Sequence, residues 1–198
     1  GEYVTRNVFP GIKSYDQYLG MLDRYGKYLV TPSQKARVEA IGTALYDTAP
    51  GKMAADFTYP DVNGKDVSLS DFKGKVVLVD VWATWCGGCV EGLPDFMALR
   101  DQYKDRKDVV FLTIPDDGIE GKAHWQNFLK EKKYTGKIPH LLINNNKDRF
   151  EEDYCITGIP RYILIDKEGK IVNAWHVSTR HEMFPWFFGV ELDNLNKN

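Results

Sequence analysis

The chain has 198 residues, with 26 basic and 28 acidic side chains and a formal net charge of −2. This balance argues against a strongly electropositive surface for nucleic acids or anionic membranes. Hydrophobic residues make up 43% of the chain, which is ordinary for a globular protein. No apolar run approaches the roughly 18 residues that a membrane-spanning helix needs. We therefore expect one globular domain with an extension, no nucleic-acid partner and no spanning helix.

Residues 1–50 predict two amphipathic helices. Ser14 followed by Gln17 fits a capping box, and apolar residues then continue at helical spacing until Gly26. The run Thr31-Pro32-Ser33-Gln34 is a second helix-start signal, with Pro32 at the first helical position because its fixed backbone torsion suits that position. We interpret this segment as a helical extension that packs against the main domain, and binding of a partner is the alternative.

The remainder of the chain, residues 51–198, predicts strands that alternate with helices. The order strand, helix, strand, helix and hairpin predicts an α/β sheet whose first strands are parallel. Pro185 interrupts the aromatic tail, so we expect no single helix there. The expected strands are 57–60, 66–69, 75–81, 109–114, 141–143, 161–166 and 170–175, and the expected helices are about 90–103 and 120–133.

Two cysteines, Cys86 and Cys89, follow directly on the most apolar strand, where the next helix begins. Unpaired N–H groups and the positive end of the helix dipole favour a thiolate at that position. A thiolate is the nucleophile of disulfide exchange. We expect Cys86 to be exposed and attacking, and Cys89, about one turn later, to be shielded and resolving.

A zinc site is the alternative interpretation of a pair of cysteines with this spacing. Zinc needs about four ligands, and the chain has no second such pair. We therefore expect no metal ion and no cofactor, and we interpret the third cysteine, Cys155, as a buried packing thiol. The histidines are scattered and are expected to be surface or packing residues: His124, His140, His176 and His181.

Asp80 and a proline are the other candidates for the site. Asp80 lies on the apolar strand before the cysteines, where burial would raise its pKa and let it accept the proton of Cys89. A cis bond before Pro160 would expose the backbone of Ile159 for pairing with an extended substrate segment. Pro139 has a similar setting, and the residues alone do not separate the two prolines.

The segments VDVWATWCGGC at 79–89 and GIPRYILIDKEG at 158–169 resemble the thioredoxin superfamily. The leader at 57–75 is similar to the TlpA/ResA-like branch, which is grouped with the AhpC/TSA and redoxin families. The resemblance covers about residues 51–175. It implies a thioredoxin fold with an extra N-terminal hairpin, a central insertion and a preceding helical segment of the kind found in envelope proteins of Bacteroides-type bacteria.

The resemblance also implies a thiol-disulfide oxidoreductase that acts on protein thiols in the periplasm or cell envelope, and we expect a reductant. By this resemblance Cys86 is the nucleophile, Cys89 the resolving thiol, Asp80 the buried acid and Pro160 the cis-proline. The expected substrate-contacting residues are Trp85, Gly87, Gly88 and Ile159.

Two positions depart from the family pattern. Gly88 stands where the family usually has proline, which leaves the direction of electron flow open. Gly92 stands where many relatives have glutamate, and Glu91, one step earlier, is rotated by about 100° on a helix and should not replace it.

Two other functions remain open at this point. A thiol peroxidase of the AhpC/TSA type is one. Such enzymes need a threonine two residues clear of the reactive cysteine and a preceding proline, whereas here only Trp85 separates Thr84 from Cys86 and no proline lies just upstream. A non-catalytic binding module is the other, with the cysteines as a structural remnant and the N-terminal helices and aromatic tail as the binding surface.

Overall fold

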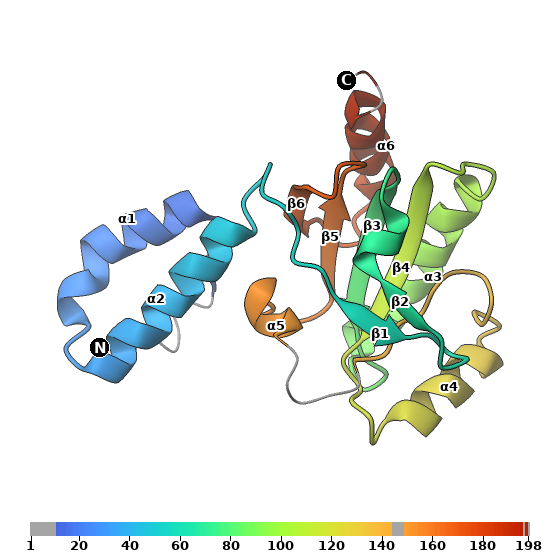
Figure 1. The fold of residues 1–198 in the computed structure, drawn as a ribbon, viewed down its shortest axis with the longest axis horizontal. Helices are drawn as coiled ribbons and strands as arrows, with labels where there is room; N and C mark the ends of the chain where they lie inside the picture. Colours follow the sequence, from blue (N-terminus) through green and yellow to red (C-terminus); the bar gives the residue numbers. More distant parts are fainter. Residues whose placement is uncertain (1–10, 144–148, 196, 198) are drawn as a thin grey trace.

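A computed structural model describes residues 11–143, 149–195 and 197 of the chain (Figure 1). The N-terminal part holds α1 (Tyr15–Tyr25), η3 (Gly26–Tyr28) and α2 (Pro32–Asp47). The chain then forms β1 (Thr58–Pro60), β2 (Asp66–Ser68), η4 (Leu69–Phe72), β3 (Val76–Trp82), α3 (Gly87–Gln102), β4 (Val109–Pro115) and α4 (Lys122–Glu131). It ends with α5 (Phe150–Asp153), β5 (Arg161–Ile165), β6 (Ile171–His176) and α6 (Phe184–Leu195).

A four-stranded sheet with the strand order β4-β3-β5-β6 forms the centre of the molecule. β3 pairs in parallel with β4 and antiparallel with β5, so the expected mixed α/β sheet with parallel first strands is confirmed. The crossover through α3 is what allows two consecutive strands to be parallel. All seven residues of β3 are buried, because layers of side chains cover both faces of the sheet at this strand.

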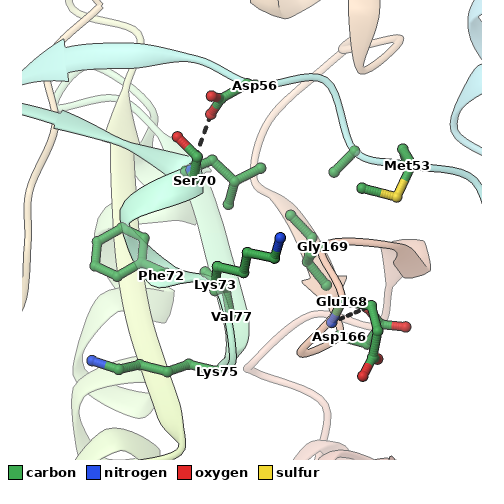
Figure 2. Close-up of a pocket in the computed structure, with 13 residues that line it drawn as sticks. Met53, Asp56, Ser70, Phe72, Lys73, Lys75, Val77, Asp166, Glu168 and Gly169 are labelled. Atoms are coloured by element: carbon green, nitrogen blue, oxygen red, sulfur yellow. Dashed lines mark hydrogen bonds between the residues drawn. The ribbon is translucent and has the colours of Figure 1, made fainter.

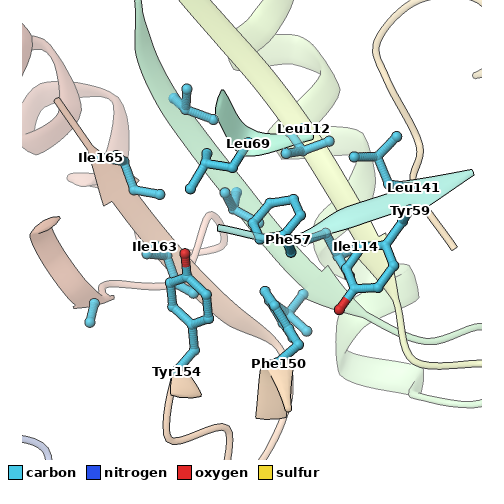
Figure 3. Close-up of a cluster of buried hydrophobic side chains, with 14 of the residues drawn as sticks. Phe57, Tyr59, Leu69, Leu112, Ile114, Leu141, Phe150, Tyr154, Ile163 and Ile165 are labelled. Atoms are coloured by element: carbon cyan, nitrogen blue, oxygen red, sulfur yellow. The ribbon is translucent and has the colours of Figure 1, made fainter. Parts of the chain in front are cut away.

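One face of the sheet is covered by an aromatic cluster (Figure 3). Phe57 stacks on Tyr59 of the β1–β2 hairpin. Phe150 of α5 meets both of these rings edge-on, and Tyr154, the residue after α5, contacts Phe57 and Phe150. The opposite face packs against α3 and α6, chiefly through Phe96, Phe184, Phe188 and Leu192.

Both N-terminal helices begin at the predicted caps. Ser14 accepts a hydrogen bond from the backbone N–H of Gln17, and Thr31 and Gln34 form a reciprocal capping box. Apolar residues of the two helices cluster with Cys155 and Trp175, which lie beyond the helical segment. The division into an extension and a main domain stays a prediction.

Two local predictions were wrong, and one short helix was missed. The stretch 141–143 forms no strand, because this part of the chain meets β4 in a single bridge between Thr113 and His140. α5 carries no strong periodic signal at four residues and was not predicted. α6 does form as one helix, since Pro185 is its second residue and needs no intrahelical hydrogen bond there. Among the described residues, no helix is long and apolar enough to span a membrane.

Candidate active site

Cys86 is the N-cap residue of α3, directly after the buried strand β3. Its Sγ is joined to the Cys89 Sγ in a disulfide, with the two Cα atoms 5.2 Å apart. Cys89 is only 1% exposed. Cys86, which we expected to be exposed, is half-buried. The Cys86 sulfur is therefore the one that a second molecule can reach.

A backbone donor already points at the reachable sulfur. The N–H of Cys89 donates to the Cys86 Sγ over 3.2 Å, which is the N-cap geometry of a helix start. The positive end of the helix dipole acts at the same place. When the disulfide opens, these groups would stabilise a Cys86 thiolate relative to the thiol.

The Ile159–Pro160 peptide bond is cis, and no other cis bond occurs among the described residues. The rival proline, Pro139, is therefore not the cis-proline. The carbonyl oxygen of Ile159 lies 3.9 Å from the Cys86 Sγ. A disulfide sulfur carries no hydrogen, so this approach is a contact and not a hydrogen bond. It places the backbone of Ile159 directly beside the reachable sulfur.

The turn before Cys86 is anchored by a residue that sequence analysis did not identify. The backbone N–H of Thr84 donates to both carboxylate oxygens of Asp117, at 3.2 and 3.1 Å, and the Thr84 hydroxyl donates to the same carboxylate. Parallel strands end at the same edge of a sheet, so Thr84 after β3 meets Asp117 after β4. The adjacent acidic residues Asp116 and Asp117, directly after β4, were the signal in the sequence that could have identified this contact. Since the Thr84 hydroxyl is used by Asp117, nothing here favours a peroxidase.

The expected substrate-contacting residues surround the disulfide. Trp85 is 67% exposed, although its indole N–H donates to the backbone oxygen of Asp116 over 3.3 Å. Gly87 and Gly88 are exposed, and a Cβ on either would meet nothing within 4 Å. Neither glycine is required by close packing, so their role in substrate contact stays a prediction.

At Gly92, where many relatives have glutamate, side chains from other elements occupy the space that a larger residue would need. A Cβ on Gly92 would lie 3.1 Å from the Thr179 Oγ1 and 3.2 Å from the Tyr162 hydroxyl, so a larger side chain has little room. Glu91 points instead to the surface, where its carboxylate lies 2.7 Å from the Arg180 guanidinium. The prediction that Glu91 does not replace the missing glutamate therefore agrees with its position.

Asp80 is 1% exposed on β3. Neither carboxyl oxygen has a hydrogen-bond partner among the described residues. Burial raises the pKa of the Asp80 carboxyl well above its usual range. A carboxyl whose pKa is raised in this way keeps its proton to a higher pH than a solvated carboxyl does, which is the property required of an acid that serves Cys89.

Replacing Asp80 with asparagine is expected to change how stability depends on pH. The folded-state pKa of Asp80 lies above the unfolded value of about 3.9. The contribution of Asp80 protonation to the free energy of unfolding is therefore fully present below about pH 3.9 and is lost as the pH rises through the folded-state pKa. Over that window the free energy of unfolding of the parent should fall, relative to Asp80→Asn, by about 1.4 kcal/mol per pH unit. Urea unfolding of both proteins between pH 4 and pH 8 measures this, and a constant difference would contradict it.

The remaining chemistry-bearing residues lie in the interior. Cys155 is a free, buried thiol whose pKa burial raises, as expected for a packing residue. His140 and His176 are buried too, which agrees with their predicted packing roles. Within the described ranges, no three His, Cys, Asp or Glu side chains come together as a metal site.

A pocket of about 270 Å³ lies at the other end of the sheet (Figure 2). Lys75 and Val77 line it at the start of β3, whereas Cys86 follows the end of this strand. In Figure 2, Lys73 extends across the pocket towards Gly169, while Lys75 points away. Val77 and Trp82 are about 16 Å apart along the strand. We assign this pocket no part in the chemistry of the disulfide.

The order of β3, α3, β4 and the β5–β6 hairpin, with a disulfide in the first turn of α3, defines a thioredoxin-fold protein. The Redoxin family model matches residues 49–183. The chain belongs to the Redoxin family, which confirms the resemblance drawn from the sequence.

Named relatives agree with this assignment. The chain is 34% identical over 144 residues to the thiol-disulfide oxidoreductase ResA of Bacillus subtilis, covering 68% of this chain and 76% of that protein. It is also 34% identical over 122 residues to ResA of Bacillus thuringiensis, covering 62% of this chain, and it spans 66% of the length of that relative. The thioredoxin domain of a Bacteroides vulgatus thiol-disulfide oxidoreductase superposes with a TM-score of 0.61 at 32% identity, covering 72% of this chain and 97% of that one.

Proposed function

We propose that this protein is a thiol-disulfide oxidoreductase that exchanges its Cys86–Cys89 disulfide with thiols and disulfides of other proteins. The observation that carries the proposal is the half-buried Cys86 sulfur at the N-cap of α3, beside a shielded partner sulfur. The relatives named as oxidoreductases support the same activity.

The exchange proceeds in two displacements. In the reductive direction the Cys86 thiolate attacks a substrate disulfide, so that one substrate sulfur leaves with the electron pair of the broken bond and a mixed disulfide forms. Cys89 then loses its proton to Asp80 and attacks the Cys86 sulfur, which releases the second substrate sulfur as a thiolate. The product is the Cys86–Cys89 disulfide, so the protein loses two electrons and the substrate gains two.

The substrate contacts in this proposal come from the surroundings of Cys86. An extended segment of a substrate protein pairs with the backbone of Ile159 as an added strand, while exposed Trp85 covers its side chains. Gly87 and Gly88 leave room for that segment at the start of α3. We place the protein in the cell envelope, where disulfide-bonded proteins occur, and expect it to act as a reductant.

The reduction potential of the Cys86–Cys89 couple tests the proposal. Equilibration with glutathione buffers, with the dithiol quantified by alkylation and mass spectrometry, gives the value directly. A potential between about −270 and −120 mV is expected for an exchanging couple, and the reductive end of that range is expected here. A potential below about −300 mV marks a structural disulfide and would contradict the proposal.

A further inference from the structure

Asp80 lies in a row of buried polar side chains that crosses the whole sheet. The strand register pairs Asp80 with Thr113 on β4 and with Tyr162 on β5, and Tyr162 with His176 on β6. Paired residues point to the same face, with Cβ atoms about 4.5–5.5 Å apart. All four residues are buried. The carboxyl group of Asp80 therefore has a hydroxyl-bearing neighbour on each side.

On the β4 side, the hydrogen of the neighbouring hydroxyl is directed away from Asp80. The His140 Nε2 lies 3.2 Å from the carbonyl oxygen of Tyr134, which can only accept, so Nε2 carries the hydrogen. Burial lowers the pKa of His140 to about 4, so the ring is neutral and its Nδ1 is an acceptor. The Thr113 hydroxyl, 2.7 Å from Nδ1, must therefore donate to it. Only the lone pairs of the Thr113 oxygen remain for Asp80.

The same holds on the β5 side. The Thr179 hydroxyl donates to the carbonyl oxygen of Gly92 over 3.1 Å. The Tyr162 hydroxyl lies 2.9 Å from the Thr179 Oγ1, whose single hydrogen is already used, so Tyr162 is the donor in this pair. The tyrosine hydrogen is therefore also directed away from Asp80. Neither neighbouring hydroxyl has a hydrogen left to offer a carboxylate.

We propose that His140 and Thr179 are positioning residues that hold the hydrogens of both hydroxyls away from Asp80 and thereby keep Asp80 as a neutral acid in the disulfide state. Neither hydroxyl is a hydrogen-bond partner of the Asp80 oxygens, so both act through the orientation of their dipoles. With both hydrogens directed elsewhere, neither dipole stabilises an Asp80 carboxylate in the interior, whereas a neutral carboxyl does not need that stabilisation. The arrangement adds to the effect of burial.

Within the described part of the chain, no charged group around Asp80 opposes this effect. On α3, which covers this face, Glu91 pairs with Arg180 and Asp95 is exposed, and Cys86 and Cys89 are joined and do not titrate. At the far end of the row, the His176 Nε2 lies 2.6 Å from the Glu191 carboxylate of α6. Burial is the cause of the raised pKa of Asp80.

The consequence for catalysis rests on the proposed function. When an incoming thiolate attacks the Cys86 Sγ, the disulfide breaks and its electron pair leaves on the Cys89 Sγ. The proton of the Asp80 carboxyl then moves to that sulfur, giving a Cys89 thiol and an Asp80 carboxylate. A resting state that already holds this proton is ready to stabilise the buried leaving group.

Infrared spectroscopy of the disulfide form tests the proposal without any catalytic step. The C=O stretch of a protonated carboxyl is followed against pH, and Asp80→Asn identifies the band. We expect the band to persist at pH 7 in the parent. In His140→Leu the freed Thr113 hydrogen can turn to Asp80 and stabilise the carboxylate, so the midpoint should fall by about one pH unit, a tenfold change in the ionisation constant.

Two further variants separate positioning from structural disturbance. His140→Asn keeps an acceptor near Nδ1 and should restore the parent midpoint. His140→Leu combined with Thr113→Val has no hydrogen to turn, so the fall should disappear. If His140→Leu does not fold, Thr179→Val frees the Tyr162 hydrogen and should lower the midpoint in the same way.

An unchanged midpoint in the folded His140→Leu protein, or an ionised Asp80 at pH 7 in the parent, overturns the proposal. The readout uses the resting disulfide protein, so failure of the proposed oxidoreductase activity would show in the insulin assay and would leave this result intact.

Discussion

Replacing Cys86 with serine is expected to reduce the rate of insulin disulfide reduction to that of the reductant alone. Cys86 carries the more accessible of the two sulfurs, and the N–H of Cys89 points at it and would stabilise its thiolate once the disulfide opens. Cys89 cannot take over the attack, because it is 1% exposed beneath the first turn of α3. The precipitation of insulin chains, followed by turbidity with a fixed concentration of dithiothreitol, measures the loss.

Cys155→Ser is the matched control for this experiment. It makes the same substitution, cysteine to serine, at a buried site in the cluster that the N-terminal helices form with Trp175. Burial raises the pKa of the Cys155 thiol, so this residue is a poor nucleophile and the parent rate should be kept. Activity retained in Cys86→Ser, or lost in Cys155→Ser, would show that the cysteine pair is not the reacting group.

The parts of this fold with strong local signals were predictable from the sequence. Thr31 and Pro32 mark the start of α2 because a cap and a fixed torsion act within one turn. The apolar run of β3 identified the buried strand, and the cysteines next to it identified the site. Each of these features depends on residues close in sequence.

The features that were missed depend on residues far apart in sequence. Asp117 anchors Thr84 across 33 positions, and His140 fixes Thr113 across 27 positions. Only the parallel pairing of β3 and β4 brings the ends of these strands together, and no local pattern encodes that register. The stretch 141–143 shows the same limit. This apolar triplet resembles a strand, but the chain pairs with β4 only through the single bridge at His140.

The row of buried polar side chains around Asp80 combines both kinds of feature. Asp80 stands out in the sequence because its neighbours in the strand are apolar. By our proposal, its protonation depends on hydrogen bonds made by residues distant in sequence, His140 and Thr179. Gly92 belongs to the same network, since its carbonyl fixes Thr179 and a side chain there would collide with Thr179 and Tyr162. The loss of the family glutamate is therefore matched by a different set of polar contacts beneath α3.

Replacing Cys89 with serine should convert the protein into a trap for its substrates. Cys86 still attacks, because the stabilising N–H at position 89 belongs to the backbone and survives the change. The mixed disulfide then lacks the neighbouring thiol that would displace it, so about one substrate per chain should stay attached. Non-reducing gels and mass spectrometry detect the complex, and dithiothreitol should release it.

The double variant Cys86→Ser/Cys89→Ser is the control for trapping and should form no complex. Cys89→Ser/Cys155→Ser should trap as well as Cys89→Ser, since the buried Cys155 takes no part. A complex linked through Cys155, or one that resists dithiothreitol, would contradict the assigned roles. Trapping by Cys89→Ser together with none by Cys86→Ser would establish the order of the two sulfurs, because only the attacking cysteine can hold the substrate.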